Sequence, residues 1–133
     1  MELAIDRLTK QFGSAIAVDR VSATFTPGVY GLLGANGAGK TTLMRMICDV
    51  LKPTSGSVLY DGTDIAKLGA DYRAHLGYLP QDFGYYPDFS ALDFMLYLGS
   101  LKGIDRRTAR RRSLDLLEMV GLADVAKRKI KTF

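Results

Sequence analysis

The chain has 133 residues and a formal net charge of +4; 47% of its residues are hydrophobic and 24% are charged, an ordinary balance for one globular domain. No apolar run approaches the length of a bilayer span, and acidic residues stand near the N-terminus where a signal peptide would be basic. The single cysteine, Cys48, excludes an internal disulfide, and we expect it to be a buried, inert thiol.

Short strands are expected in the first part of the chain. Residues 2–8 and 21–25 alternate between apolar and polar side chains, which is typical of strands with one buried face. Residues 29–33 form a continuous apolar run, as expected of a strand that a parallel sheet buries on both faces. Further along, residues 57–60 predict a strand before an Asp-Gly turn, and residues 76–79 predict another that a proline stops.

The segment from Gly34 to Thr41 reads Gly-Ala-Asn-Gly-Ala-Gly-Lys-Thr, which is the G-x-x-x-x-G-K-[ST] pattern of a phosphate-binding loop. It follows the apolar run and precedes a helix expected over residues 42–47, the strand, turn and helix order that this chemistry needs. Glycines let backbone N–H groups turn toward phosphate oxygens, and the start of the helix adds its own unpaired N–H groups. The pattern predicts binding of a nucleoside triphosphate.

Two helices are expected in the last part of the chain. Ser90, with Asp93 three residues later, resembles a capping box and opens a helix through Leu101. Asp105 is expected to cap a second helix, which stops at Gly121. The residues expected on the apolar side of this second helix are Leu116, Leu117 and Val120.

Positive charge gathers in this second helix and near the C-terminus. We interpret the arginines of the helix as its solvated side, with Arg111 and Asp115 spaced for an i,i+4 pair. No aromatic residue interleaves with them, as a stacking surface for single strands requires, so nucleic acid is not an expected partner. The basic residues are Arg106, Arg107, Arg110, Arg111, Arg112, Lys127, Arg128, Lys129 and Lys131.

The phosphate-binding loop and its neighbours resemble the Walker A region of ABC-type ATPases, down to Asn36 and the two threonines after the lysine. An aromatic residue, Phe12, precedes the loop, as in the family's A-loop, whose ring stacks on adenine. Residues 53–62 are similar to the family's first hairpin after the loop, and residues 77–81 to its Q-loop. The resemblance covers essentially the whole chain and implies the N-terminal part of an ABC transporter ATP-binding subunit.

The fold that the resemblance implies is α/β: a P-loop NTPase core, with a mixed sheet around the P-loop strand and helix, joined to the start of a helical subdomain. We place a partial nucleotide-binding core, with the A-loop and Walker A, over residues 1–80. The Q-loop and the start of the helical subdomain follow over residues 81–133. Together they are expected to form one truncated ABC ATPase domain.

ATP and Mg²⁺ are the cofactors that the resemblance implies. Phe12 is assigned to adenine, with a core residue as the alternative. Gln81 is assigned a catalytic role, offering its amide oxygen to Mg²⁺ or to the attacking water, with a solvated loop amide as the alternative. Thr41 and Gln81 are the expected metal ligands. The residues expected at the phosphates are Gly34, Asn36, Gly37, Gly39, Lys40, Thr41 and Thr42.

Two tyrosines have two possible roles each, and one histidine is expected to have no catalytic role. Tyr85 and Tyr86 either meet a coupling helix of a transporter or cap the apolar helix that follows them. His75 precedes the Q-loop, whereas the family's switch histidine lies far downstream, so we expect no catalytic task for it.

Several motifs of the family are not found in these 133 residues: the signature, the Walker B strand with its acids, and the switch histidine. We therefore expect the chain alone to bind nucleotide without efficient hydrolysis, because the catalytic base beside Walker B is missing. We also expect marginal stability or aggregation, since the strand at residues 29–33 would lack buried partners.

Coupling of ATP binding and hydrolysis to transport across a membrane, of the export type, is the implied function. The expected partners are ATP, transmembrane transporter subunits, and a second ATP-binding subunit that shares nucleotide at a dimer interface. The expected location is the cytoplasmic face of a membrane. The alternatives are a soluble ABC-type ATPase acting on nucleic acid or the ribosome, and an inactive nucleotide-binding remnant.

Overall fold

The computed structural model describes residues 1–81 and 83–133. The chain divides between Tyr78 and Leu79 into two units, each with its own internal packing. The first unit contains a sheet and the phosphate-binding loop, and the second is helical.

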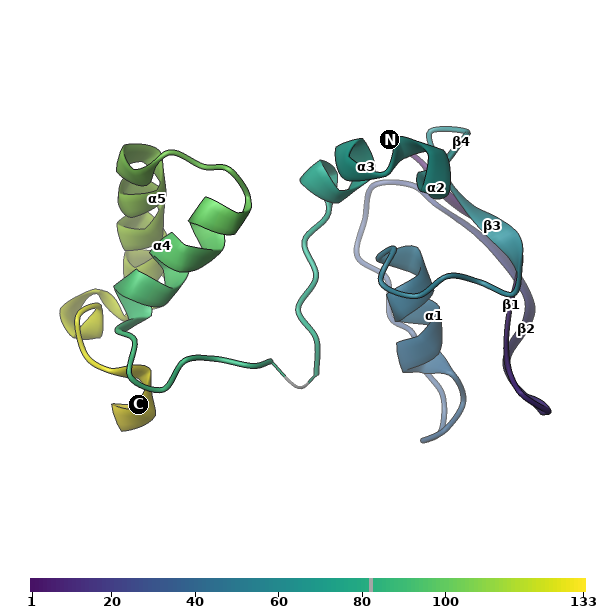
Figure 1. The fold of residues 1–133 in the computed structure, drawn as a ribbon, viewed down its shortest axis with the longest axis horizontal. Helices are drawn as coiled ribbons and strands as arrows, with labels where there is room; N and C mark the ends of the chain where they lie inside the picture. Colours follow the sequence, from purple (N-terminus) through teal and green to yellow (C-terminus); the bar gives the residue numbers. More distant parts are fainter. Residues whose placement is uncertain (82) are drawn as a thin grey trace. The chain divides into compact units, whose positions relative to one another are not determined.

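An antiparallel sheet with the strand order β2-β1-β3-β4 forms the framework of the first unit (Figure 1). β1 (Leu3–Phe12) and β2 (Ala15–Phe25) make a long hairpin. β3 (Ser55–Tyr60) pairs with the other edge of β1, and β4 (Thr63–Asp64) adds a short hairpin to β3. The strands predicted from alternation and from the Asp-Gly turn are therefore confirmed, and both strands of the first hairpin are longer than predicted.

The two strands predicted from apolar runs, at residues 29–33 and 76–79, are wrong for this structure, which assigns no strand to either segment. Val29 is fully exposed, and Leu33 is 92% exposed. A central strand of a parallel sheet is held by hydrogen bonds to a neighbour on each side. Among the described residues, every strand pair is antiparallel and none includes these segments. The apolar run alone is therefore not enough to make a strand.

α1 (Lys40–Ile47) packs on one face of the sheet (Figure 1). Leu43 and Met46, three residues apart and thus on one side of the helix, join Leu8 of β1 in the core. Cys48 follows the helix and is buried, as predicted, and burial raises the pKa of its thiol.

α2 (Ile65–Leu68) and α3 (Ala70–His75) follow the sheet. The Asp64 carboxylate caps α2 by accepting a hydrogen bond from the Ala66 N–H. The buried Tyr72 donates its hydroxyl to the Ile47 carbonyl at 2.7 Å, which links α3 to the end of α1. Burial raises the pKa of Tyr72 to about 12, so this hydroxyl stays a donor throughout the neutral range.

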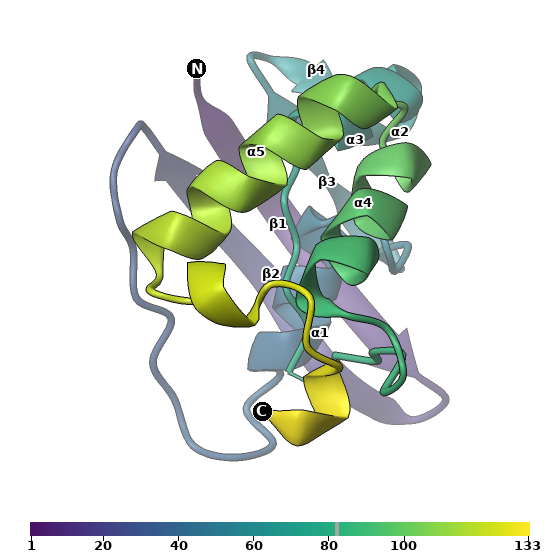
Figure 2. The ribbon, with the colours of Figure 1, turned by 90° about the vertical axis from the view of Figure 1, so that its left-hand side faces the viewer.

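The second unit contains α4 (Ala91–Leu101) and α5 (Arg106–Met119), which pack side by side (Figure 2). Both predicted caps are confirmed: Ser90 Oγ accepts from the Asp93 N–H at 3.1 Å, and Asp105 Oδ1 accepts from the Thr108 N–H at 3.0 Å. A Cβ added at Gly99 of α4 would lie 3.1 Å from Ala109 Cβ of α5. This contact between small residues lets the two helices approach closely.

The apolar side predicted for α5 is only partly correct. Leu117 is buried, whereas Leu116 and Val120 are exposed. The buried positions of α5 recur every four residues, at Ala109, Ser113 and Leu117. Leu116 is turned about 100° away from Leu117 around the helix axis, which places it off this stripe.

The C-terminal segment of the chain is attached to the residues just before and at the start of α4. η1 (Ala123–Val125) and η2 (Ile130–Thr132) are short 3₁₀ turns in this segment. The Leu92 N–H donates to the Ala126 carbonyl, and the Ile130 N–H donates to the Phe89 carbonyl, both at 2.9 Å. These bonds tie together two parts of the second unit that are far apart in sequence.

Candidate functional site

The phosphate-binding loop contains a tight turn over residues 35–38. The Ala38 N–H donates to the Ala35 carbonyl at 3.2 Å, with Asn36 and Gly37 between them. Gly37 has φ 83°, a left-handed value that glycine adopts without steric cost. Asn36 and Gly37 are both exposed, so the tip of the loop is accessible.

Gly39 connects this turn to α1, and two independent features require a glycine there. Its φ is also 83°. A Cβ added at Gly39 would lie only 2.0 Å from the Ala17 carbonyl oxygen of β2. The missing side chain therefore lets the end of the loop lie against the sheet, with α1 starting at the next residue.

Lys40, the first residue of α1, turns its side chain back over the loop. Its ammonium donates to the carbonyl oxygens of Gly34 at 2.5 Å and Ala35 at 2.7 Å. Both acceptors are neutral, so these two bonds do not neutralise the positive charge of Lys40. An anionic oxygen placed at the loop is a better acceptor than either carbonyl.

The start of α1 fits a phosphate group. The first turn contains no acidic residue, and a helix start presents unpaired N–H groups together with the positive end of the helix dipole. Thr41 is exposed and Thr42 is half-buried in this turn, so a hydroxyl is available beside the backbone donors. With Lys40, the donors present are those that a phosphate bound with a divalent cation uses.

Phe12 lies at the hairpin end of β1, and the residue is 52% exposed. It is therefore not part of the core that the described residues form, and its assignment to adenine stays a prediction. The Lys10 ammonium lies 5.2 Å from the ring centroid, a cation–π distance. Phe12 pairs with Ala15 of β2, roughly 7 Å along the strand from Ala17, the residue that Gly39 touches. The fold thus brings Phe12 and the loop to the same end of the hairpin.

Gln81 belongs to the second unit and is exposed. Its assignment to Mg²⁺ or water stays a prediction. The ring centroid of Tyr86 lies 5.0 Å from that of Phe89 and 5.5 Å from that of Tyr97. Tyr86 therefore covers α4, which is one of the two roles predicted for it. Tyr85 is about half exposed, and both of its predicted roles, contact with a coupling helix or a cap on α4, stay open.

His75 ends α3, where its Nδ1 lies 2.8 Å from the Asp71 carbonyl oxygen. Its ring also lies 6.0 Å from that of Tyr60, between centroids. Both contacts are local to the end of the helix and the adjoining strand, and neither involves a residue of the phosphate-binding loop.

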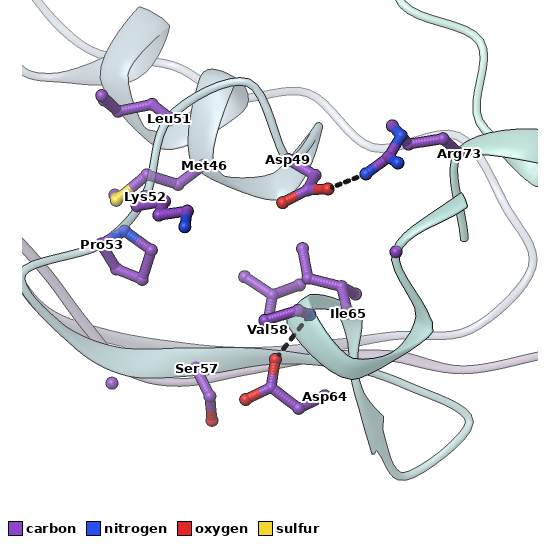
Figure 3. Close-up of a pocket in the computed structure, with 13 residues that line it drawn as sticks. Met46, Asp49, Leu51, Lys52, Pro53, Ser57, Val58, Asp64, Ile65 and Arg73 are labelled. Atoms are coloured by element: carbon purple, nitrogen blue, oxygen red, sulfur yellow. Dashed lines mark hydrogen bonds and ion pairs between the residues drawn. The ribbon is translucent and has the colours of Figure 1, made fainter. Parts of the chain in front are cut away.

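A separate pocket of about 450 Å³ in the first unit was not predicted from the sequence (Figure 3). Asp49, just after α1, pairs with Arg73 of α3 at 2.7 Å on one side of this pocket. Asp64 lies on the other side, with Val58 and Ile65 between (Figure 3). The φ of Asp49 is 55°, a conformation that Asp tolerates better than most residues. The ion pair of Asp49 with Arg73 links the segment after α1 to α3.

Among the residues that the structure describes, no helix is long and apolar enough to cross a bilayer.

The sequence matches the family model described as ABC transporter over residues 18–133. It is 38% identical to the ABC transporter ATP-binding protein YhaQ of Bacillus subtilis (strain 168), over 97% of this chain and 43% of that protein. It is 34% identical to the linearmycin resistance ATP-binding protein LnrL of the same strain, over 98% of this chain and 42% of that protein. A third relative is the methionine import ATP-binding protein MetN of Corynebacterium diphtheriae, 39% identical over 92% of this chain and 38% of that protein. The chain thus spans less than half the length of these relatives.

Solved structures agree in fold. An ABC transporter ATP-binding protein from Pyrococcus furiosus superposes on the whole chain with a TM-score of 0.81 and 27% identity, and the chain covers 63% of it. An ATP-binding subunit of another ABC transporter superposes with a TM-score of 0.75 and 21% identity, over 56% of its length, which shows the fold alone. These matches confirm the predicted fold class, α/β with a P-loop NTPase core.

Proposed function

The chain belongs to the ABC transporter family, and from this premise we propose that it forms the ATP- and Mg²⁺-binding part of a transporter's ATP-binding subunit. The observation that carries the proposal is the Lys40 ammonium, turned over the loop and held there by two neutral carbonyls. Such a cation is ready to exchange its weak acceptors for phosphate oxygens.

The phosphates of ATP are bound by the loop and the start of α1. Lys40 reaches the β- and γ-phosphates, and backbone N–H groups from Gly34 to Gly39, including that of Asn36, point at their oxygens. Thr42 lies at the α-phosphate. Thr41 offers its hydroxyl to Mg²⁺, which, when bound, neutralises charge on the β- and γ-phosphates.

Adenine stacks on the exposed face of Phe12. Lys10 lies over this ring at 5.2 Å from the centroid, and a ring has a second face for the base. Support for this assignment comes from the β1–β2 hairpin. Phe12 pairs with Ala15, which is two residues from Ala17, and the end of the phosphate-binding loop at Gly39 lies against Ala17.

Gln81 offers its amide oxygen to Mg²⁺ or to the attacking water. Hydrolysis, transport and partners belong to the whole subunit, which docks on transmembrane subunits at the cytoplasmic face and pairs with a second ATP-binding subunit. We infer the export type from the stretch between Gly77 and Gly103.

Replacement of Lys40 tests the binding site. Lys40→Ala should weaken MgATP binding by roughly 10- to 100-fold, because a charge-assisted hydrogen bond contributes about 1.5–3 kcal/mol. A fluorescent ATP analogue titrated into the full chain measures the affinity. Lys67→Ala, an exposed lysine of α2, is the matched control and should leave the affinity unchanged. Equal affinities of wild type and Lys40→Ala, with unchanged circular dichroism, would contradict the assignment.

Replacement of Gln81 tests its proposed role in ATP turnover. In the full-length subunit assembled with its transmembrane partners, Gln81→Ala should lower ATP turnover and leave MgATP affinity largely intact, because the phosphates are held by the loop. A large loss of affinity would instead mean that Gln81 is part of the binding site itself.

A further inference from the structure

Four arginines form a contiguous exposed surface on the first half of α5. They form two adjacent pairs whose members are three or four positions from members of the other pair, so side chains one helical turn apart are neighbours. We define the arginine face by these residues: Arg106, Arg107, Arg110 and Arg111.

No carboxylate neutralises the arginine face within the described residues 1–81 and 83–133. Ion pairs there join other residues, and the predicted pair of Arg111 with Asp115 is not formed. The nearest acid in sequence, Asp105, uses its carboxylate to cap the helix by accepting from the Thr108 N–H. The positive charge of this surface therefore faces solvent.

The position of the arginine face on the helix is unfavourable for an isolated chain. The first turn of α5 contains Arg106 and Arg107 and no acidic residue, so apart from the Asp105 cap the positive end of the helix dipole meets charges of its own sign. Pairs such as Arg106 with Arg110 and Arg107 with Arg111 place like charges four residues apart, which is destabilising. A helix that needed only a solvated surface would mix the two signs of charge. A bound anion would reduce the repulsion of the arginines by the helix dipole and by one another.

An exposed apolar side chain lies within the arginine face. Leu114 follows Arg111 by three residues and Arg110 by four, so it is their neighbour on the helix, and it is exposed. At the surface of a bilayer, guanidinium groups bind lipid phosphates while neighbouring apolar side chains enter the boundary with the acyl chains. A nucleic acid would neutralise the arginines but offer Leu114 only a polar backbone.

We propose that the arginine face is a binding surface for anionic lipid headgroups. The surface lies in the helical unit and uses no residue assigned to nucleotide, so the proposal goes beyond the nucleotide-binding function and does not depend on it.

Sedimentation of the full chain with vesicles tests the proposal. The chain should bind vesicles of phosphatidylcholine mixed with phosphatidylglycerol, should not bind phosphatidylcholine alone, and should dissociate as salt is raised. The triple variant Arg107→Gln, Arg110→Gln, Arg111→Gln should lower the partition coefficient on the order of 100-fold.

Two variants control for folding and for net charge. Replacing the same three arginines by lysine keeps the charge and should retain most of the binding. Replacing Arg45, Lys52 and Lys67 of the first unit by glutamine removes the same charge elsewhere and should change binding by less than about threefold. Circular dichroism checks that each variant remains folded.

Three outcomes would overturn the proposal. The first is equal binding to neutral and anionic vesicles, or none to either. The second is an equal loss in the two glutamine variants, which would mean attraction to net charge alone. The third is tighter binding to duplex DNA or single-stranded RNA than to anionic vesicles at the same salt concentration, which would make the surface a nucleic-acid site.

Discussion

The two units of this chain contrast in how their elements are specified. In the second unit, helices begin at Ser90 and Asp105, whose side chains cap backbone N–H groups only three residues away. In the first unit, the strand expected at residues 29–33 required partners from distant parts of the sheet, and it is not formed. Elements encoded by local hydrogen bonds can be predicted from a short stretch of sequence, whereas a central strand depends on its neighbours.

The largest effect on stability is expected at one of two leucines of the first unit, both of which lie in segments predicted to be strands. Leu8→Ala should lower the free energy of unfolding by about 2–5 kcal/mol, because Leu8 is 0% exposed and its removal leaves a cavity. Leu33→Ala should change it by less than about 0.5 kcal/mol, since this side chain already faces solvent. Urea denaturation measures both. A large effect at Leu33 would show that residues 29–33 are packed in solution.

The next test concerns the loop glycines. Gly39→Ala should destabilise the first unit by about 2–4 kcal/mol, because the new Cβ would meet the Ala17 carbonyl at 2.0 Å and the backbone φ is positive. Gly37→Ala is the matched control, with the same φ and no atom within 4 Å of the new Cβ, and should cost about 1 kcal/mol. Unfolding of the nucleotide-free variants gives both values, and equal losses would refute the close contact with β2.

A smaller effect is expected in the helical unit. Ser90→Ala should cost about 1 kcal/mol, because it removes the side chain that caps α4. Ser100→Ala, on the same helix, removes only a hydroxyl that donates to the carbonyl three residues before it, and should stay within about 0.5 kcal/mol. Amide hydrogen exchange of α4 separates the two variants. Equal protection in both would show that the cap does not contribute.

The smallest expected effect is a pH dependence at the C-terminal segment. Hydrogen bonds from Lys131 and Lys129, with the charges of these lysines, hold the pKa of Asp88 below its ordinary value of 3.8. A lowered folded-state pKa means that the stabilisation is present above pH 3.8 and is lost as the pH falls through the folded-state pKa.

Asp88→Asn removes the carboxylate and should abolish this acid-range change, which NMR of the Lys131 ammonium and the Ile130 amide can follow. If wild type and Asp88→Asn titrate alike below pH 4, the ion pairs with Lys129 and Lys131 are not populated in solution.

The candidate site shows the same division between local and distant information. The G-x-x-x-x-G-K-[ST] pattern alone predicts which residues bind phosphate, because these residues are consecutive and their geometry is a property of one turn and one helix start. That Phe12 lies at the loop end of the hairpin required the pairing of β1 with β2. No local signal connects Asp49 with Arg73, which are 24 positions apart.

The sequence by itself determined the family, the phosphate-binding loop, and the caps and ends of the two long helices, because each depends on residues within a few positions of one another. Only the tertiary structure decided that residues 29–33 stay unpaired, that Gly39 rests against Ala17, and that the arginine face has no acidic partner among the described residues. These features depend on which distant segments come together. That choice is made by the free energy of packing and pairing across the whole unit, which no single window of sequence contains.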